Sequence, residues 1–264
     1  GPYRDRKAYD LLIQSEGGFL SVTGTPDDMA KAGCSIADIA AGMYAYSSIL
    51  AALVQRGKTG KGAKIEISML EAMAEWMSYP LYYAYEGAPP PPRAGAAHAT
   101  IYPYGPFPAG DGRIVMLGLQ NEREWASFCE SVLDNAALAT DPRFASNAAR
   151  NENRQALREI ILGKLATMTL DAVVARLEAA GIANAAVNTM ADLWAHPQLK
   201  ARDRWREISS PAGMLPALLP PGDSSAFEAR MDAIPALGEH TEALLGELGL
   251  SGTDILALRQ EKAI

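Results

Sequence analysis

Residues 35–62 read SIADIAAGMYAYSSILAALVQRGKTGKG, and this stretch decides how the fold is interpreted. It contains a run of 19 residues, 36–54, in which Asp38 is the only charge. The pattern predicts a helix over residues 35–56 that ends before Gly57, because glycine is favoured just after a helix. The run is close to the length of a membrane span, but a buried helix of an α/β core has the same pattern. We therefore expect a core helix and no membrane contact.

The composition is that of an ordinary globular protein. The chain has 264 residues, 48% of them hydrophobic, and a net charge of −7. An acidic chain lacks the basic footprint of a general nucleic-acid-binding protein, so no nucleic-acid partner is expected. Two cysteines, Cys34 and Cys129, cannot form a disulfide framework or a zinc site by themselves. The first residues, GPYRDRK, contain no signal peptide, and we expect a cytoplasmic protein.

The sequence context of Asp38 leaves two interpretations open. With Ser35 as N-cap, Asp38 occupies the third helical position and completes a variant of the capping box. Alternatively, its carboxylate is a nucleophile or base at the start of a helix, where the helix dipole stabilises an anion. The two roles are compatible with each other.

A proline run divides the chain. Residues 88–93, APPPPR, form a stiff extended segment and the best domain boundary. Pro80 is expected to end or kink the helix before it. We expect strands over residues 63–68, 112–119 and 182–187, helices over 69–79, 122–133, 151–166, 170–180, 238–250 and 253–262, and a loop over 211–222.

Common catalytic motifs are missing from the sequence. The turn GKTGKG at residues 57–62 lacks the Lys-Ser or Lys-Thr of a P-loop, and it follows a predicted helix where a P-loop follows a strand. The three histidines, His98, His196 and His240, lie far apart and none has a metal-like partner three or four residues away. We expect no metal site.

A series of short motifs resembles the class III CoA-transferases of the CaiB/BaiF family. The motifs occur in family order over almost the whole chain, which is far more specific than any one of them. They are GPY at 1–3, KAYD at 7–10, TGTPD at 23–27, IADIAAG at 36–42, ILAAL at 49–53, RGKTGKG at 56–62, DPRF at 141–144, AGI at 180–182, HP at 196–197, GEHT at 238–241 and LGL at 248–250.

The resemblance implies an α/β fold with a discontinuous, Rossmann-like large domain and a smaller α+β domain. Residues 1–90 and 190–264 would belong to the large domain, and residues 91–189 would form the small one. The family forms interlocked homodimers, so a second copy of the chain is the expected partner. Family members also carry an N-terminal Rossmann-like segment before the Gly-Pro at which this chain starts, so the chain resembles a C-terminal portion.

The resemblance also implies the site. Asp38 matches the family's catalytic aspartate, and Lys7, Ala8, Tyr9 and Asp10 match a segment that binds CoA. The family's glycine-rich loop over the active site falls near residues 95–98, so Ala96, Ala97 and His98 are the candidate substrate residues. Alanines stand where some members have glycines, which changes how closely this backbone can approach a substrate. Coenzyme A is expected as substrate, with no other cofactor.

The implied activity moves CoA from an acyl-CoA to a carboxylic acid by covalent catalysis at Asp38. IYPYGPF at 101–107 and LQNEREW at 119–125 resemble the branch that acts on C4 and C5 dicarboxylates such as mesaconate, itaconate and citramalate. The second carboxylate would need a cation or donors. The candidates are Arg93, His98 and Arg123.

Two other readings remain. An acyl-CoA α-carbon racemase shares the fold, but racemisation needs two bases, and those relatives carry a His-Asp pair where this chain has Tyr9-Asp10. An inactive interaction module is the third reading.

Overall fold

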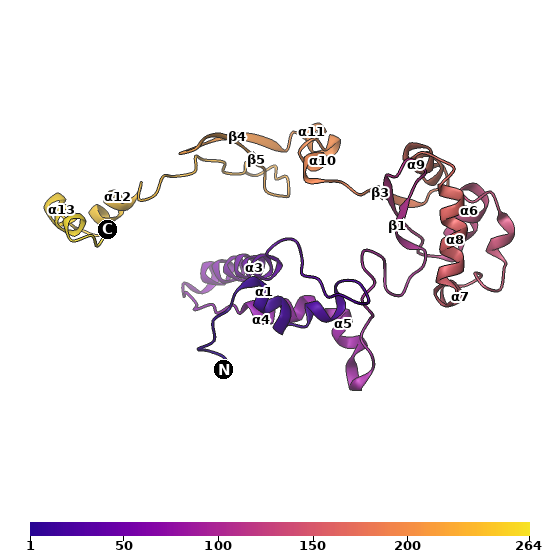
Figure 1. Ribbon diagram of the computed structural model, residues 1–264. Helices are drawn as coiled ribbons and strands as arrows, with labels where there is room; N and C mark the ends of the chain where they lie inside the picture. Colours follow the sequence, from indigo (N-terminus) through magenta and orange to yellow (C-terminus); the bar gives the residue numbers. More distant parts are fainter. The chain divides into compact units, whose positions relative to one another are not determined.

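A computed structural model describes residues 1–264, which divide into two units, residues 1–187 and 188–264 (Figure 1). The first unit contains two hydrophobic clusters, one among the N-terminal helices and one in a small α+β part.

The N-terminal part of the first unit is helical. Its elements are α1 (Asp10–Glu16), α2 (Phe19–Val22), α3 (Ile36–Thr59), α4 (Met69–Trp76), α5 (Ser78–Tyr83) and the 3-10 helix η1 (Tyr85–Gly87). Helix α3 packs against α1 and α4. The shared core consists of Ile13, Ala37, Met73 and Met77, so only the start of α3 contributes to it.

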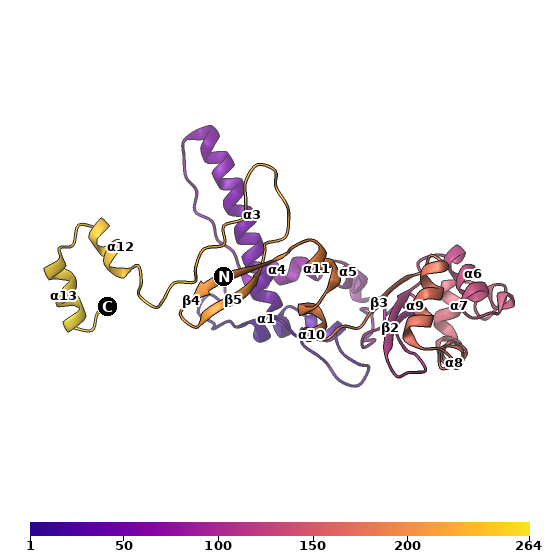
Figure 2. The ribbon, with the colours of Figure 1, turned by 90° about the horizontal axis from the view of Figure 1, so that it is seen from above.

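Helix α3 is longer and much more exposed than the sequence predicts. It continues through Gly57 to Thr59 and is followed by the cap residue Gly60, whose φ of 72° is the left-handed conformation that glycine adopts without strain. Only Ala37 and Ala40 are buried, and the far half of the helix extends away from α1 and α4 (Figure 2). The exposed apolar side chains are Ile39, Met43, Tyr46, Ile49, Leu50, Leu53 and Val54. The expectation of a buried core helix is therefore wrong for this chain on its own.

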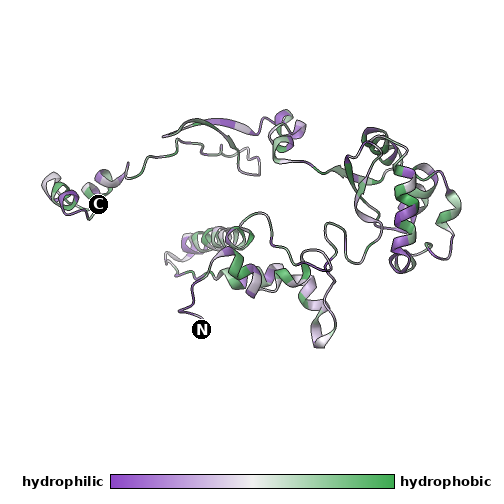
Figure 3. Ribbon diagram, viewed as in Figure 1, coloured by the Kyte–Doolittle hydropathy of each residue, from purple (hydrophilic) through white to green (hydrophobic).

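The hydrophobic residues along α3 and α4 are visible in Figure 3. By length and composition alone, α3 could cross a membrane, a test that the core helix of a soluble protein also passes. The absence of membrane contact stays a prediction.

Two local expectations around residue 70 are corrected. Residues 63–68 alternate apolar and polar side chains but form no strand, because they pair with no other strand and are mostly exposed. The break after α4 occurs at Met77, before Pro80. Pro80 lies in the first turn of α5. Proline is tolerated there because the N–H groups of a first turn have no partner within the helix.

The small α+β part is an antiparallel sheet covered by helices. Its strands are β1 (Tyr104–Pro108), β2 (Ile114–Gly118) and β3 (Ala183–Ala186), in the order β1-β2-β3. Its helices are α6 (Glu122–Ser131), the 3-10 helix η2 (Ala136–Ala139), α7 (Asn147–Glu152), α8 (Arg154–Leu165) and α9 (Leu170–Ala179). Phe107, Leu117, Trp125, Leu157 and Leu177 are among the side chains that form its buried core.

The sequence predicts β2, β3, α6, α8 and α9, and the structure confirms them with ends shifted by a few residues. It misses β1, whose sequence YGPFP contains Pro106 and Pro108. Proline is tolerated there because β1 lies at the edge of the sheet, where its missing N–H removes no necessary ladder bond. It also misses α7, which is separated from α8 at Asn153.

The second unit is built around a hairpin. Its elements are α10 (Met190–Trp194), α11 (Pro197–Ala201), β4 (Trp205–Ser210), β5 (Gly213–Leu218), α12 (Thr241–Glu247) and α13 (Gly252–Gln260). The loop expected over residues 211–222 is wrong, because β5 pairs with β4 in register from Ser210↔Gly213 to Trp205↔Leu218. Buried Arg204 pairs with Asp223 and donates to the Leu219 carbonyl, which fixes the end of the hairpin.

Every strand pair in residues 1–264 is antiparallel. The parallel sheet of a Rossmann-like domain is therefore not among these strands, and the α/β, Rossmann-like large domain that the resemblance implies stays a prediction. The discontinuous domain joining residues 1–90 to 190–264 stays a prediction.

Candidate active site

Asp38 lies in the first turn of α3 with a free carboxylate. It is exposed, and its side chain makes no hydrogen bond or ion pair within residues 1–264. Ser35 precedes the helix but makes no capping bond either. The capping-box interpretation is therefore wrong. The carboxylate remains available for chemistry in the field of a 24-residue helix.

Asp10 supplies the cap that Ser35 does not. Its Oδ1 accepts the Ala37 N–H at 3.0 Å, and its Oδ2 accepts from Gln14 Nε2 at 2.8 Å. Buried Gln14 in turn accepts the Ala32 N–H at 2.9 Å through Oε1. Asp10 and Gln14 thus hold both the loop before α3 and the start of α3, which places α1 beside the residue preceding Asp38.

The other residues of the predicted CoA segment, Lys7, Ala8 and Tyr9, are exposed and immediately precede α1. Tyr9 is the N-cap residue of α1 and is 67% exposed. The structure brings this segment to the N-terminal end of α3 through Asp10, whose own carboxylate is engaged in capping.

The first unit contains a cavity of about 420 Å³ between the N-terminal helices and the predicted substrate loop. Its lining is mainly apolar: Phe19, Val22, Thr23, Ile36, Met73, Trp76, Met77, Tyr79, Pro80, Pro91, Pro92, Ala94, Gly95, Ala97, His98 and Ala99. Of the predicted substrate residues, Ala97 and His98 line it and Ala96 does not. Asp38 is not part of the lining, but Ile36 of the same helix turn is.

The start of the substrate loop is held by the backbone of residues 24–26. The Gly95 N–H donates to the Gly24 carbonyl at 2.7 Å. Arg93 donates through Nε to the Thr25 carbonyl and through Nη2 to the Pro26 carbonyl, both at 2.8 Å. Arg93 is therefore engaged with the backbone, which weakens it as a candidate partner for a substrate carboxylate.

Ala97 lies against Gly105 of β1. A Cβ at position 105 would come within 2.8 Å of the Ala97 Cβ and 3.0 Å of its Cα. The alanine in the loop is thus accommodated by a glycine in the neighbouring strand, so the loop packs closely at this point.

His98 is fixed by its own neighbours. Its Nδ1 accepts the N–H groups of Thr100 at 3.2 Å and Ile101 at 3.1 Å. Its ring stacks on Tyr104 with 5.3 Å between centroids and 12° between planes. Arg123, the remaining candidate for binding a carboxylate, is exposed on α6 and does not line the cavity.

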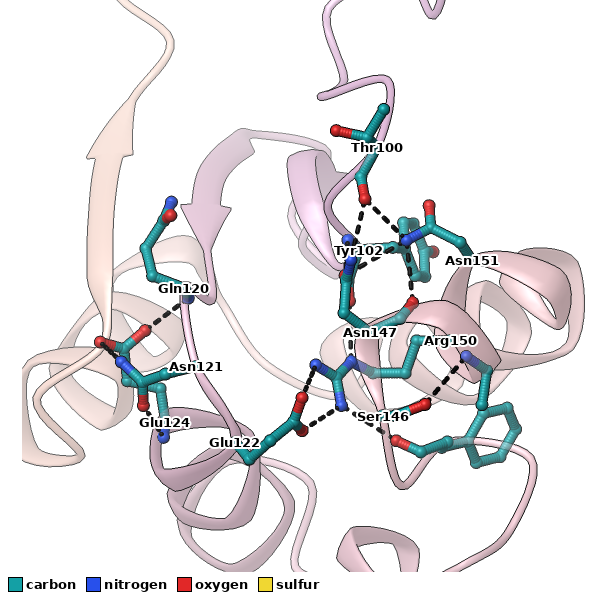
Figure 4. A network of polar contacts seen from close by, with 12 residues as sticks. Thr100, Tyr102, Gln120, Asn121, Glu122, Glu124, Ser146, Asn147, Arg150 and Asn151 are labelled. Atoms are coloured by element: carbon teal, nitrogen blue, oxygen red, sulfur yellow. Dashed lines mark hydrogen bonds and ion pairs between the residues drawn. The ribbon is translucent and has the colours of Figure 1, made fainter.

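A motif-based reading misses the side chains that hold this segment. Asn147, Asn151 and Arg154 hydrogen-bond to the backbone of residues 98–102, and Figure 4 shows the two asparagines turned toward Thr100. They lie 45 to 56 positions away from the residues that they bind, so no local sequence pattern identifies them.

A model of CoA-transferase family III matches residues 1–241. The chain belongs to CoA-transferase family III. The expected resemblance is thereby confirmed. The succinate–glutarate CoA-transferase of Agrobacterium fabrum is 32% identical to this chain over 252 residues, which cover 94% of this chain and 62% of that protein.

Further relatives agree. The succinyl-CoA:mesaconate CoA-transferase of Haloarcula hispanica is 28% identical over 253 residues, covering 94% of this chain and 62% of that protein. The crystal structure of a CaiB/BaiF family protein from Brucella suis matches with a TM-score of 0.78 at 34% identity, covering 94% of this chain and 65% of that one. The chain thus spans less than two thirds of the length of these family members.

Proposed function

We propose that the protein moves CoA from an acyl-CoA to a carboxylic acid with Asp38 as nucleophile. The Asp38 carboxylate attacks the thioester carbonyl, the C–S bond breaks, and a mixed anhydride and CoA thiolate form. The thiolate then attacks the aspartyl carbonyl, which releases the donor acid as a carboxylate and leaves an aspartyl-CoA thioester. The acceptor carboxylate then attacks the aspartyl-CoA thioester, which gives a second mixed anhydride and CoA thiolate. The thiolate attacks the acceptor's carbonyl in this anhydride, which gives the new acyl-CoA and free Asp38.

The free carboxylate of Asp38 is the observation that carries this proposal. It is exposed, without a hydrogen-bond partner, at the start of a helix whose first turn is fixed from outside by Asp10. A nucleophile must be able to leave its resting position and reach the thioester, which a capping carboxylate could not do without loss of its bonds. Family membership supports the reaction class.

The racemase alternative is not favoured. Racemisation needs a base on each face of the α-carbon. The carboxylate of Asp10 is bonded to Ala37 and Gln14, and Tyr9 beside it stands where the racemase relatives carry a histidine. The relatives named above are transferases. An inactive module would not need the unpaired carboxylate of Asp38.

For the substrate we propose a C4 or C5 dicarboxylate. The names of the relatives described above include succinate, glutarate and mesaconate. His98 lines the cavity, whereas Arg93 is bonded to the backbone and Arg123 lies outside. We therefore assign the free carboxylate of the substrate to His98.

We also propose a cytoplasmic, interlocked homodimer with no metal and no cofactor beyond CoA itself. The exposed apolar face of α3 supports burial against another surface. A homodimer of this kind should bury more than about 2,000 Å². Lys7, Ala8 and Tyr9 are proposed to contact CoA, because they are exposed at the same end of α3 as Asp38.

The test compares Asp38→Asn and Asp38→Ala in the complete protein, with succinyl-CoA as donor and transfer read by mass spectrometry. Both should lose transfer by several orders of magnitude. Both should unfold at nearly the wild-type urea concentration, because Asp38 makes no capping bond. Hydroxylamine added with acyl-CoA should trap a modified Asp38 peptide in the wild type alone. Normal transfer by Asp38→Asn, with deamidation excluded by mass, would refute the mechanism.

A further inference from the structure

Three side chains of the small α+β part bind the backbone of residues 98–102. Asn147 accepts the Tyr102 N–H at 3.0 Å and donates to the Thr100 carbonyl at 2.9 Å. Asn151 donates to the same carbonyl at 2.9 Å. Arg154 donates through Nη2 to the carbonyls of His98 at 3.2 Å and Ala99 at 3.3 Å, and to Asn151 Oδ1 at 2.6 Å.

We call these three residues, Asn147, Asn151 and Arg154, the anchor row. They lie on α7 and the start of α8, and Figure 4 shows Asn147 and Asn151 converging on Thr100. Arg154 has no carboxylate within ion-pair distance, since every ion pair of the chain involves other residues. Its guanidinium lies over the Tyr102 ring, 4.7 Å from the centroid. The segment itself therefore determines where Arg154 lies.

The anchored segment fixes the chemistry of His98. An imidazole nitrogen that accepts N–H bonds carries no hydrogen, and Nδ1 accepts from both Thr100 and Ile101. The hydrogen of His98 is therefore on Nε2, which is the only polar atom of the ring left for a ligand. The two N–H groups keep this arrangement only while the backbone at residues 100 and 101 stays in place.

His98 lines a cavity whose other walls are mainly apolar. A hydrogen bond formed in such surroundings is stronger than the same bond in water, and it is stronger still when the acceptor is charged. A substrate oxygen entering the cavity would find no arginine or lysine among the lining residues. Of the residues of the predicted substrate loop that line the cavity, His98 is the one with a polar side chain.

We propose that the anchor row positions His98 as an Nε2–H donor to a carboxylate or thioester oxygen of the substrate. The inference rests on the transferase function proposed above. The three anchor residues are positioning residues: they touch the backbone around His98, while His98 alone would touch the substrate. They also tie the helices of the small α+β part to the substrate loop.

The first readout needs no turnover. Long-range ¹H–¹⁵N spectra of the complete protein, labelled in its histidines, report which ring nitrogen carries the hydrogen, and His98→Gln identifies the His98 signals. Wild-type His98 should show the Nε2–H form. Arg154→Met and the Asn147→Ala, Asn151→Ala double variant should shift it toward a mixture of tautomers. Arg154→Lys keeps a donor for the His98 carbonyl and should restore part of the wild-type spectrum.

Arg158→Met is the matched control. Arg158 is one turn further along α8 and also lies over an aromatic ring, 5.3 Å from the Phe107 centroid, but it donates to no backbone carbonyl of residues 98–102. It should leave the tautomer unchanged. In transfer assays Arg154→Met should lower kcat/KM by about tenfold more than Arg158→Met, the size expected for one weakened hydrogen bond to a charged group.

An unchanged Nε2–H form in Arg154→Met and in the double variant would overturn the proposal. So would kcat/KM losses equal to that of Arg158→Met. His98→Phe should lose at least as much kcat/KM as Arg154→Met, and full activity in His98→Phe would also overturn it. Normal transfer in Asp38→Asn together with the tautomer shift would instead count against the transferase mechanism, so the two failures are distinguishable.

Discussion

The carboxylate of Asp10 caps helix α3 through the Ala37 amide, at 3.0 Å, one residue before Asp38. A cap supplied from another helix does two things at once. It accepts one of the N–H groups at the start of α3 that have no partner within the helix. It also leaves the neighbouring carboxylate of Asp38 without a structural role. The two acidic residues near this helix end therefore have different roles, one structural and one proposed to be chemical.

Replacing Asp10 should therefore cost stability more than activity. Asp10→Ala removes the bonds to Ala37 and Gln14 and should lower the free energy of unfolding by about 1–2 kcal/mol. Asp10→Asn keeps an oxygen acceptor and should lose less. Urea unfolding measures both, with Asp5→Ala as control, because Asp5 pairs only with exposed Arg4. A KM for acyl-CoA that rises sharply in Asp10→Asn at unchanged stability would show that Asp10 contacts CoA directly.

The sequence predicts the parts of the fold that depend on local pattern. The helices over Glu122–Ser131 and Leu170–Ala179 are found because their apolar periodicity is clear and because, for the second, Gly181 follows its end. Residues 63–68 have an equally clear alternation and form no strand, because a strand exists only with a partner. The strand Gly213–Leu218 is missed for the opposite reason: the prolines of residues 211–222, Pro216 of the strand among them, hide a pairing that β4 provides.

The candidate site is predicted unevenly for the same reason. Asp38 can be singled out from the sequence because it is the only charge in residues 36–54. The cap by Asp10 joins residues 27 positions apart, and the anchor row reaches His98 from 56 positions away. Contacts over such separations follow from tertiary packing, which leaves no local pattern. Asp38 as nucleophile and His98 as donor remain predictions.

Arg150 should be the most sensitive charged residue of the small α+β part. Its side chain is 2% exposed, and it donates to the Tyr102 carbonyl at 2.9 Å, the Phe144 carbonyl at 3.0 Å and Glu122 at 2.7 Å (Figure 4). Arg150→Met leaves these acceptors unpaired and should lower the free energy of unfolding by about 3 kcal/mol. Arg123→Met, at an exposed arginine of α6, should change it by less than about 0.5 kcal/mol. Equal urea midpoints for the two variants would contradict this account.

The two cysteines should differ strongly in reactivity. Cys129 is fully buried, and this burial raises its pKa to about 12, whereas Cys34 is exposed. Because the thiolate is the reactive form, a disulfide reagent at pH 8 should modify one thiol in the native protein and the second only after unfolding. Cys34→Ser should remove the fast reaction. Rapid modification of native Cys34→Ser would mean that Cys129 is accessible.

Asp111 should make folding sensitive to acid. The Leu170 N–H, which its Oδ2 accepts at 3.0 Å, and the Arg113 guanidinium hold the pKa of this carboxyl below its usual value. A depressed folded-state pKa gives stability that is present above the unfolded pKa and is lost as pH falls through the folded one. Asp111→Asn should therefore lose less stability than the wild type below about pH 4, because it has no carboxyl to protonate. Urea midpoints measured across this range, with Asp5→Asn as control, test the difference; parallel curves would contradict it.

The close packing of Ala97 on Gly105 should be visible as coupling between the two positions. Gly105→Ala places a Cβ 2.8 Å from the Ala97 Cβ, so the loop must move away from β1. The variant should lose about 1–3 kcal/mol of stability, and kcat/KM should fall because Ala97 and His98 line the same cavity. Adding Ala97→Gly removes the clashing atom and should recover part of both losses, although the Cα of residue 97 remains 3.0 Å away. Gly163→Ala, in mid-helix with nothing within 4 Å, is the control and should stabilise the protein slightly. Strictly additive effects of the two substitutions would show that the loop does not rest on β1 in solution.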